Sequence, residues 1–465
     1  MSDAYRTFVA GKLDLSHATK GIDVTERSLN KAAFPFQRHL TRWALGVGKA
    51  ALFAGCGLGK TLMALDWARV VAAKSHGRVL ILAPLAVSQQ TVREGAKFGI
   101  SVRYARDQSE VAGPISITNY ERLAKFDPAT FSGVVLDESG IIKNYSGKVK
   151  GQIFAAFKDT PYKLACTATP APNDHMELGQ HAEFLDVLTS HEMLARWFVN
   201  DMTSFGTYRL KGHAAQAFWD WVCSWARCVA SPADLGYSDA GYQLPGLEIE
   251  RHVVPVDVTT DTNGELFRTP DMSATAVHRE KRRSADARAA KVAAIVKAEP
   301  SETWILWCET DYEEDALREV LPEAAIVNGK DSLEEKEERL GAFAAGEVRI
   351  LASKASIAGW GLNFQHCARM AFVGPTFSYE RFHQAIRRCH RFGQLRVVRV
   401  HVVMGQTEIG VWDILNSKAN GHDQMAVEML AATRRAVALE DTGCKPYAAT
   451  NSYQLARWVR EEAAR

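Results

Sequence analysis

Short runs of hydrophobic residues alternate with amphipathic stretches along this chain, and the whole series occurs twice. The apolar runs of the first half lie at residues 50–54, 79–84, 115–118, 134–137 and 163–167, and those of the second half lie at 304–308, 325–327, 348–352, 370–373 and 397–403. Helical periodicity marks residues 61–73, 311–321, 332–344 and 379–388. Strands that alternate with helices predict parallel sheets. We therefore expect two tandem α/β lobes.

The segment between the two series differs from them in composition. Four tryptophans recur there at helical spacing, at positions 197, 219, 221 and 225. Such a stripe is typical of a helical core, and we favour this interpretation over an exposed platform for stacking bases. We predict a first lobe at 1–173, a Trp-rich helical insertion and linker at 174–250, a second lobe at 251–440 and a helical tail at 441–465.

The amino-acid composition is ordinary and excludes few classes of protein. The 465 residues are 47% hydrophobic, and the net charge of +2 argues against a tail-driven polyanion binder but leaves a local basic groove open. The eight cysteines form no CxxC pair, which favours buried thiols in a reducing compartment. Neither a signal peptide nor a membrane-length apolar run is present in the sequence, so we expect a cytoplasmic protein without a membrane partner.

The sequence AGCGLGKT at 54–61 has the composition of a phosphate-binding loop (P-loop). It follows a predicted strand and precedes a predicted helix, so backbone N–H groups can converge on a phosphate at the helix N-terminus. Lys60 can reach the β- and γ-phosphates, and the Thr61 hydroxyl can bind Mg²⁺. The other residues that we expect to line the loop are Gly55, Cys56, Gly57, Leu58 and Gly59.

A second candidate element is VVLDES at 134–139, an apolar strand that ends in two carboxylates. Asp137 would hold Mg²⁺, and Glu138 would orient and deprotonate an attacking water. An acidic cap at the end of a strand is the alternative interpretation. We favour the catalytic interpretation because a P-loop lies upstream, at a distance that fits within one domain.

Together these motifs resemble superfamily 2 helicases and translocases, a resemblance that TATP at 167–170 extends. The later motifs resemble the Swi/Snf-like branch and the compact proteins that phages and bacteria encode. They are IKN at 142–144, TPAPN at 169–173, SKASIAGWGLN at 353–363, QAIRRCHRFGQ at 384–394 and TEIGVWDILNSK at 407–418. The resemblance covers residues 36–418.

This resemblance implies two RecA-like lobes with ATP bound in the cleft between them. Gln37 would contact the adenine edge, and Gly361 and Gln384 would lie near the nucleotide. Arg388 and Arg391 would reach the γ-phosphate from the second lobe, with Arg391 as the main arginine finger. Arg387 replaces the usual glycine of this motif, and DESG replaces the DEAH or DEAD of some relatives, so Ser139 and Gly140 cannot make the histidine contact of those relatives.

For nucleic acid, the resemblance implies contacts to phosphates from loops on one side of both lobes. The candidate residues for DNA binding and for its coupling to ATP are Ser88, Thr118, Lys143, Thr167, Thr169, Ser353, Lys354 and Asn363. Such contacts do not depend on base sequence and weaken with salt.

We predict an ATP- and Mg²⁺-dependent motor that moves on DNA, with duplex favoured. A strand-separating helicase is one alternative. The other is an ATP-dependent clamp that recruits a partner such as a nuclease or a replication or recombination protein.

Overall fold

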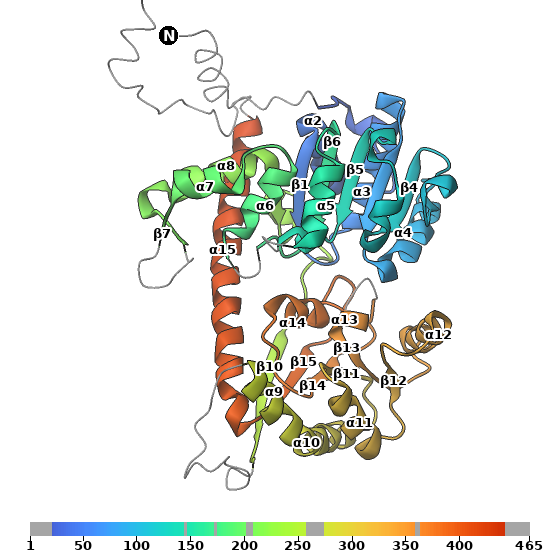
Figure 1. The fold of residues 1–465 in the computed structure, drawn as a ribbon, viewed down its shortest axis with the longest axis vertical. Helices are drawn as coiled ribbons and strands as arrows, with labels where there is room; N and C mark the ends of the chain where they lie inside the picture. Colours follow the sequence, from blue (N-terminus) through green and yellow to red (C-terminus); the bar gives the residue numbers. More distant parts are fainter. Residues whose placement is uncertain are drawn as a thin grey trace, which may run out of the picture.

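Two α/β lobes, joined by a linker and by one long helix, make up the protein (Figure 1). The computed structural model describes residues 21–143, 147–171, 174–200, 208–256, 274–358 and 363–441. Each lobe contains one parallel sheet flanked by helices, and a helical insertion separates the two sheets in sequence. The predicted fold class is confirmed.

The sheet of lobe 1 has the strand order β3-β4-β2-β5-β6-β1-β9. Its strands are β1 (Lys49–Ala54), β2 (Val79–Ala83), β3 (Arg103–Tyr104), β4 (Ile115–Asn119), β5 (Gly133–Asp137), β6 (Tyr162–Thr167) and β9 (Ala226–Val229). All pairings in this sheet are parallel. The predicted strands of the first half therefore match the observed ones to within a residue or two.

The sheet of lobe 2 has the order β10-β15-β14-β11-β13-β12 and is also parallel throughout. Its strands are β10 (Leu247–Val254), β11 (Trp304–Cys308), β12 (Ala325–Val327), β13 (Ile350–Lys354), β14 (Arg369–Phe372) and β15 (Val398–Gly405). The central strands are buried on both faces, as continuous apolar runs in parallel sheets require.

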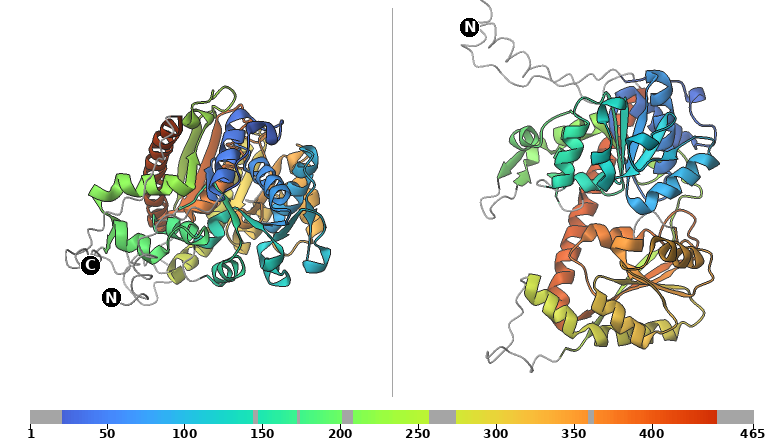
Figure 2. Two further views of the ribbon diagram at one scale, coloured as in Figure 1. Left: turned by 90° about the horizontal axis from the view of Figure 1, so that it is seen from above. Right: turned by 45° about the vertical axis from the view of Figure 1, so that its right-hand side comes forward.

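Helices cover both faces of each sheet (Figures 1 and 2). Those of lobe 1 are α2 (Pro35–Val47), α3 (Lys60–Ser75), α4 (Leu85–Lys97) and α5 (Lys148–Ala156). Those of lobe 2 are α9 (Ala274–Arg283), α10 (Ala285–Ala298), α11 (Asp311–Val320), α12 (Leu333–Ala344), α13 (Ala355–Ala358) and α14 (Tyr379–Ile386). Polar caps set several starts. Ser332, for example, forms a capping box with Glu335 at the start of α12.

The insertion contains α6 (Glu177–Phe184), α7 (Ser190–Trp197), α8 (Ala215–Trp225) and the antiparallel pair β7 (Phe198–Asn200) and β8 (Tyr208–Leu210). Its four tryptophans are at most 5% exposed, and Trp197 and Trp221 stack with ring centroids 4.5 Å apart. They form a core, as the helical spacing predicts. The strand that follows α8, β9, returns to lobe 1 and pairs with β1.

The helix α15 (Ile409–Asp441) connects the two lobes a second time (Figures 1 and 2). Near its start, Trp412 and Leu415 pack in a core of lobe 2. From its middle onward, Met425 and Met429 pack with the tryptophans of the insertion, and the C-terminal part of the helix continues along lobe 1. The same end is fixed by polar contacts, including Arg434 to Asp234 at 2.7 Å. The predicted tail falls, apart from the last residue of α15, outside the described residues.

Candidate functional site

The P-loop occupies residues 55–59, between the end of β1 and the start of α3. Gly57 and Gly59 have φ angles of 88° and 80°, in the left-handed region that favours glycine. Lys60, the first residue of α3, donates from Nζ to the carbonyl of Ala54 at 2.8 Å and to that of Gly55 at 3.3 Å. The loop and the N-terminus of α3 thus form the glycine-rich turn that suits a phosphate.

Gln37 holds the P-loop from the side. Its Nε2 donates to the Leu58 carbonyl at 2.9 Å, and its Oε1 accepts from the Phe34 N–H at 2.9 Å at the start of α2. A Cβ atom on Gly59 would lie only 2.3 Å from Gln37 Nε2, so this close approach requires glycine. The structure therefore places the residue expected at the adenine edge directly against the P-loop.

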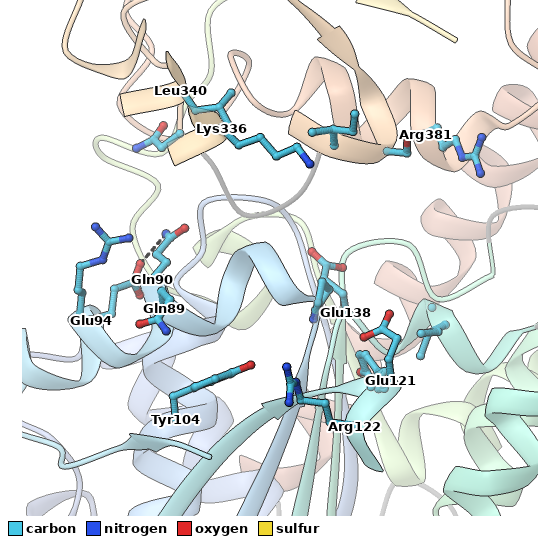
Figure 3. Close-up of a pocket in the computed structure, with 18 of the residues that line it drawn as sticks. Gln89, Gln90, Glu94, Tyr104, Glu121, Arg122, Glu138, Lys336, Leu340 and Arg381 are labelled. Atoms are coloured by element: carbon cyan, nitrogen blue, oxygen red, sulfur yellow. Dashed lines mark hydrogen bonds between the residues drawn. The ribbon is translucent and has the colours of Figure 1, made fainter. Parts of the chain in front are cut away.

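Asp137 and Glu138 lie at the carboxyl end of β5. Burial, assisted by the neighbouring Glu138 and opposed by Lys60, raises the pKa of Asp137 to about 7. Glu138 has a φ of 53°, a strained conformation for a residue other than glycine. Figure 3 shows its carboxylate at the edge of lobe 1 that faces lobe 2. The carboxyl groups of Asp137 and Glu138 thus lie where the two lobes meet (Figure 3).

A histidine that sequence reasoning missed lies beside this strand end. His181, from α6, places Nε2 3.0 Å from the hydroxyl of the buried Ser139. Burial lowers the pKa of His181 to about 4, so the ring is neutral at pH 7. Some relatives carry a histidine within the acidic motif itself. Here the insertion supplies one from elsewhere in the chain, and no local pattern could have indicated it.

The arginine motif of lobe 2 lies against the P-loop of lobe 1. It occupies the end of α14 and the turn that follows, and a Cβ atom on Gly57 would lie 2.8 Å from the Cβ of Phe392. Burial and Arg388 lower the pKa of Arg391, and Cys56 of the P-loop is among the neighbouring groups that act on it. Arg391 is therefore within electrostatic reach of the loop.

Arg388 is more deeply placed in the same motif. It is 5% exposed, and its Nε donates to the carbonyl of Gln384 at 3.2 Å. The preceding helix α14 also approaches the P-loop, since Lys60 is among the groups that lower the pKa of His383, after burial and Arg387. The motif thus contains a buried arginine, Arg388, and a partly exposed one, Arg391.

A second contact between the lobes lies beyond the acidic pair. Lys143 forms an ion pair with Glu380, a residue of α14. A Cβ atom on Gly140 would lie 2.8 Å from the same carboxylate. Within the described residues, the contacts between the lobes thus include the P-loop and the segment after Glu138.

A cleft of about 1610 Å³ opens between the lobes next to these contacts. Figure 3 shows Gln89, Gln90 and Glu94 of α4 on one wall and Lys336 and Leu340 of α12 on the opposite wall. Among the charged side chains of the lining, cations outnumber the carboxylates of Glu94, Glu121, Glu138 and Glu380, and they are Arg93, Lys97, Arg106, Arg122, Lys143, Lys336 and Arg381. Apart from Lys143, the sequence motifs did not indicate these residues.

The remaining predicted contacts fall into separate environments. Ser88, Thr118 and Ser353 are fully buried, and the Ser353 hydroxyl donates to the carbonyl of Val327 at 2.8 Å. Lys354 pairs with Asp311, whereas Asn363 lines the cleft.

Thr167 and Thr169 are buried at the end of β6, where the Thr169 N–H donates to the Thr167 hydroxyl at 3.2 Å. The two threonines therefore lie beside the acidic pair at the end of β5, with which β6 pairs. Gly361, predicted near the nucleotide, lies outside the described residues.

Comparison with known proteins gave a family match in lobe 2. Residues 288–393 match the helicase conserved C-terminal domain family, and the match ends within the arginine motif. A search of curated proteins gave no match. Among solved structures, the Sulfolobus solfataricus SWI2/SNF2 ATPase core in complex with dsDNA is similar over 91% of this chain and 98% of its own, at 16% identity and a TM-score of 0.41.

No described helix is both long enough and apolar enough to cross a bilayer. Lobe 2 contains the matching helicase domain, and lobe 1 contributes a P-loop and an acidic strand end that face it. Residues 288–393 are therefore similar to a helicase domain, which this chain pairs with a second α/β lobe that bears a P-loop.

Proposed function

We propose that the chain is an ATP-dependent motor that translocates on duplex DNA. The observation that supports this function best is the contact of the arginine motif with the P-loop, made by Phe392 and Gly57. A nucleotide bound between them would interact with both lobes. Because γ-phosphate attracts the arginines, ATP favours the closed arrangement and hydrolysis releases it.

The residues at the strand ends suit Mg²⁺. Thr61 offers a hydroxyl oxygen and Asp137 a carboxylate oxygen, the hard donors that this ion prefers. The raised pKa of Asp137 reflects a buried negative charge that nearby cations only partly offset. We infer that these two residues hold the ion, which when bound would neutralise charge on the transferring phosphoryl group.

We assign phosphate binding, proton transfer and stabilisation of the developing charge to residues of the chain itself. Lys60 would hold the phosphates, and Glu138 would accept the proton of the attacking water. Arg391, assisted by Arg388, would donate to the phosphoryl oxygens as their charge grows. Gln37 would contact the adenine edge with the amide that also holds the P-loop.

For DNA, we propose that cationic residues of the cleft contact phosphates, with Lys143 and Asn363 among the contacts predicted from sequence. Lys354 would join them from its ion pair with Asp311. Ser88, Thr118 and Ser353 are buried, so they would act by holding the loops that carry the contacts. Thr167 and Thr169 would couple DNA to the acidic pair.

The test is the ATPase rate of the full chain without nucleic acid and with single-stranded DNA, duplex DNA or RNA, at about 50 and about 200 mM salt. We expect the largest stimulation with duplex DNA and a loss of stimulation at the higher salt, because phosphate contacts release counterions. Equal rates with and without every nucleic acid would contradict the proposal.

A third-strand displacement assay separates translocation from its alternatives. A motor on duplex DNA displaces the third strand in the presence of ATP, and Glu138→Gln is the matched control without hydrolysis. Unwinding of a fork would instead favour a strand-separating helicase. ATP hydrolysis on duplex DNA without displacement would favour a clamp that recruits a partner such as a nuclease.

A further inference from the structure

A cluster of potential metal ligands lies in lobe 2, outside the lining of the interlobe cleft. Glu250 and His252 alternate along the edge strand β10 and thus project from the same face of the sheet. The parallel register places Glu250 beside His401 of β15. The fold therefore brings together two imidazoles and one carboxylate from segments about 150 residues apart in sequence.

The donor atoms are close enough to share one ion. His252 Nε2 lies 3.0 Å from His401 Nδ1, and Glu250 Oε2 lies 3.5 Å from His401 Nδ1 and 3.9 Å from His252 Nε2. Ligands of a Zn²⁺ ion, each at about 2.0–2.2 Å from the metal, are themselves about 3–3.5 Å apart. A small movement of the Glu250 side chain completes this spacing.

The hydrogen bonds within this cluster leave some of its polar atoms without a partner. A neutral imidazole pair forms one hydrogen bond, and it leaves the carboxylate at 3.5 Å, beyond a good hydrogen-bond distance. His401 is 7% exposed, and its Nε2 has no hydrogen-bond partner in the part of the chain that the structure describes. The polar role of this ring is therefore carried by Nδ1, the atom that faces the other two ligands.

We propose that Glu250, His252 and His401 bind one divalent transition-metal ion of the zinc class. Imidazole with carboxylate suits Zn²⁺, Co²⁺ or Ni²⁺, whereas Mg²⁺ and Ca²⁺ prefer oxygen ligands alone. Glu250 is about half exposed, so water completes the coordination from the open side. The site is thus separate in place and in metal class from the Mg²⁺ site proposed at Thr61 and Asp137.

The position gives the ion a structural consequence. The linker from lobe 1 enters lobe 2 at β10, and β15 leads into α15, which returns to lobe 1. An ion bound across β10 and β15 would join the strand at which the covalent linker enters lobe 2 to the strand that precedes α15, the helix that packs on lobe 1. It would stabilise lobe 2 at the base of these connections.

The experiment uses the full chain, without a histidine tag and stripped of metal by a chelator. Titration with Co²⁺ in excess Mg²⁺ is followed by visible absorption, and titration with Zn²⁺ is followed by calorimetry. We expect one equivalent to bind and the thermal midpoint of unfolding to rise. In His252→Gln and Glu250→Gln the affinity falls on the order of 10–100-fold or more, because each variant removes a ligand.

His213→Gln, which changes an exposed histidine of the insertion, is the matched control and keeps the affinity of the natural chain. Absence of Co²⁺ and Zn²⁺ binding by the natural chain would overturn the proposal. So would binding that both His252→Gln and Glu250→Gln leave unchanged. Both ligand variants change partly exposed residues, so the test does not depend on a substitution of the buried His401.

Discussion

Two buried carboxylates, Asp137 in lobe 1 and Glu313 in lobe 2, are treated in opposite ways by this fold. Burial raises the pKa of Asp137 to about 7, since Lys60 offsets only part of the cost. Burial also acts to raise the pKa of Glu313, but Arg288 and Lys281 outweigh it, so this pKa lies below its ordinary value. Asp137 therefore lacks enough nearby positive charge to offset its burial, whereas Glu313 has enough.

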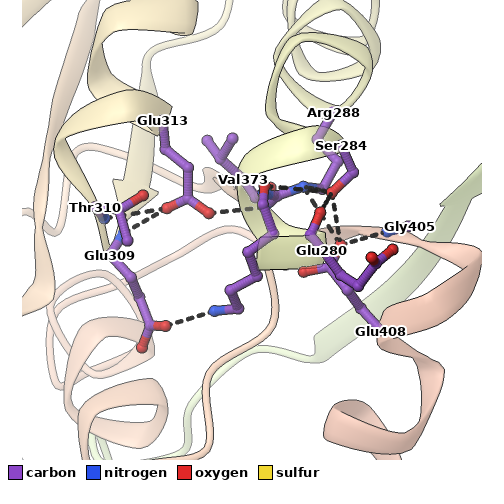
Figure 4. Close-up of polar contacts among 10 residues, drawn as sticks. Glu280, Ser284, Arg288, Glu309, Thr310, Glu313, Val373, Gly405 and Glu408 are labelled. Atoms are coloured by element: carbon purple, nitrogen blue, oxygen red, sulfur yellow. Dashed lines mark hydrogen bonds and ion pairs between the residues drawn. The ribbon is translucent and has the colours of Figure 1, made fainter. Parts of the chain in front are cut away.

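Figure 4 shows how lobe 2 supplies that charge. Glu313 accepts from Arg288 at 2.7 Å and from the N–H groups of Glu309 and Thr310 at 2.7 and 3.2 Å, at the start of α11. The same arginine lies 3.4 Å from Glu408. Arg288 and Glu313 are both inaccessible to solvent, and the hydrogen bonds of this pair all come from within the chain.

The difference separates a structural carboxylate from a functional one. A buried ion pair with all its hydrogen bonds formed fixes the packing of helices and needs nothing from outside. A buried carboxylate without a matching cation destabilises the folded chain unless a ligand brings the charge. Asp137 is of the second kind, and it lies where the nucleotide and Mg²⁺ are proposed to bind.

The largest effect is expected from Arg391, the lobe 2 residue proposed to bring positive charge to the nucleotide site of lobe 1. Arg391→Ala should reduce ATP turnover about 10³-fold or more while nucleotide binding stays nearly intact, because the arginine acts on charge that develops during hydrolysis. Steady-state ATPase rates and nucleotide titrations measure the two quantities. Arg396→Ala is the control, since Arg396 pairs with Glu302 at 2.8 Å. Turnover equal to that of the natural chain would remove Arg391 from the site.

Changes at the acidic end of β5 and in the P-loop should affect catalysis without loss of the fold. Glu138→Gln is expected to retain ATP and to lower turnover by about 10²–10⁴-fold, the contribution of a general base. Lys60→Ala should weaken nucleotide binding as well. Circular dichroism on both variants checks that the folded state persists. Unfolding of Glu138→Gln would mean that this carboxylate is structural, like Glu313.

The opposite result is expected in lobe 2. Arg288→Ala should lower the free energy of unfolding by about 3–5 kcal/mol, because Glu313 and Glu408 then remain buried without their cation. Denaturant titration measures this loss. Arg339→Ala, which removes an ion pair with Asp331 from a residue that is 40% exposed, should cost less than about 1 kcal/mol. Similar losses of unfolding free energy in the two variants would show that the buried network stabilises the fold no more than an exposed ion pair does.

The smallest effect concerns the pH dependence of stability. Because the folded pKa of Asp137 exceeds its unfolded value, the folded chain binds more protons, and Asp137 lowers stability as pH rises from about 4 to about 7. Asp137→Asn should therefore be more stable than the natural chain at pH 8 without Mg²⁺ and nucleotide, by at most about 4 kcal/mol, and nearly equal to it at pH 4. Thermal melts across this range measure the difference. A constant difference at all pH values would contradict the raised pKa.

The sequence by itself determined the local elements of this protein. Apolar runs located β1, β2, β4, β5 and β6 of the first sheet and β11 to β15 of the second. Helical periodicity located α3, α11 and α12, and tryptophan spacing indicated the buried insertion. The P-loop and the Asp137–Glu138 pair were also readable. Their chemistry depends on residues adjacent in the chain, at the boundary between a strand and the element that follows it.

Tertiary structure alone decided which distant segments meet. No local pattern showed that β9 joins the first sheet, that α15 returns to lobe 1, or that His181 reaches Ser139. The cationic side chains that gather in the cleft and the cluster of Glu250, His252 and His401 likewise depend on strand register and on the faces that pack together. The physical reason is that hydrogen bonding within an element is local, whereas packing and charge pairing are set by contacts between residues far apart in sequence.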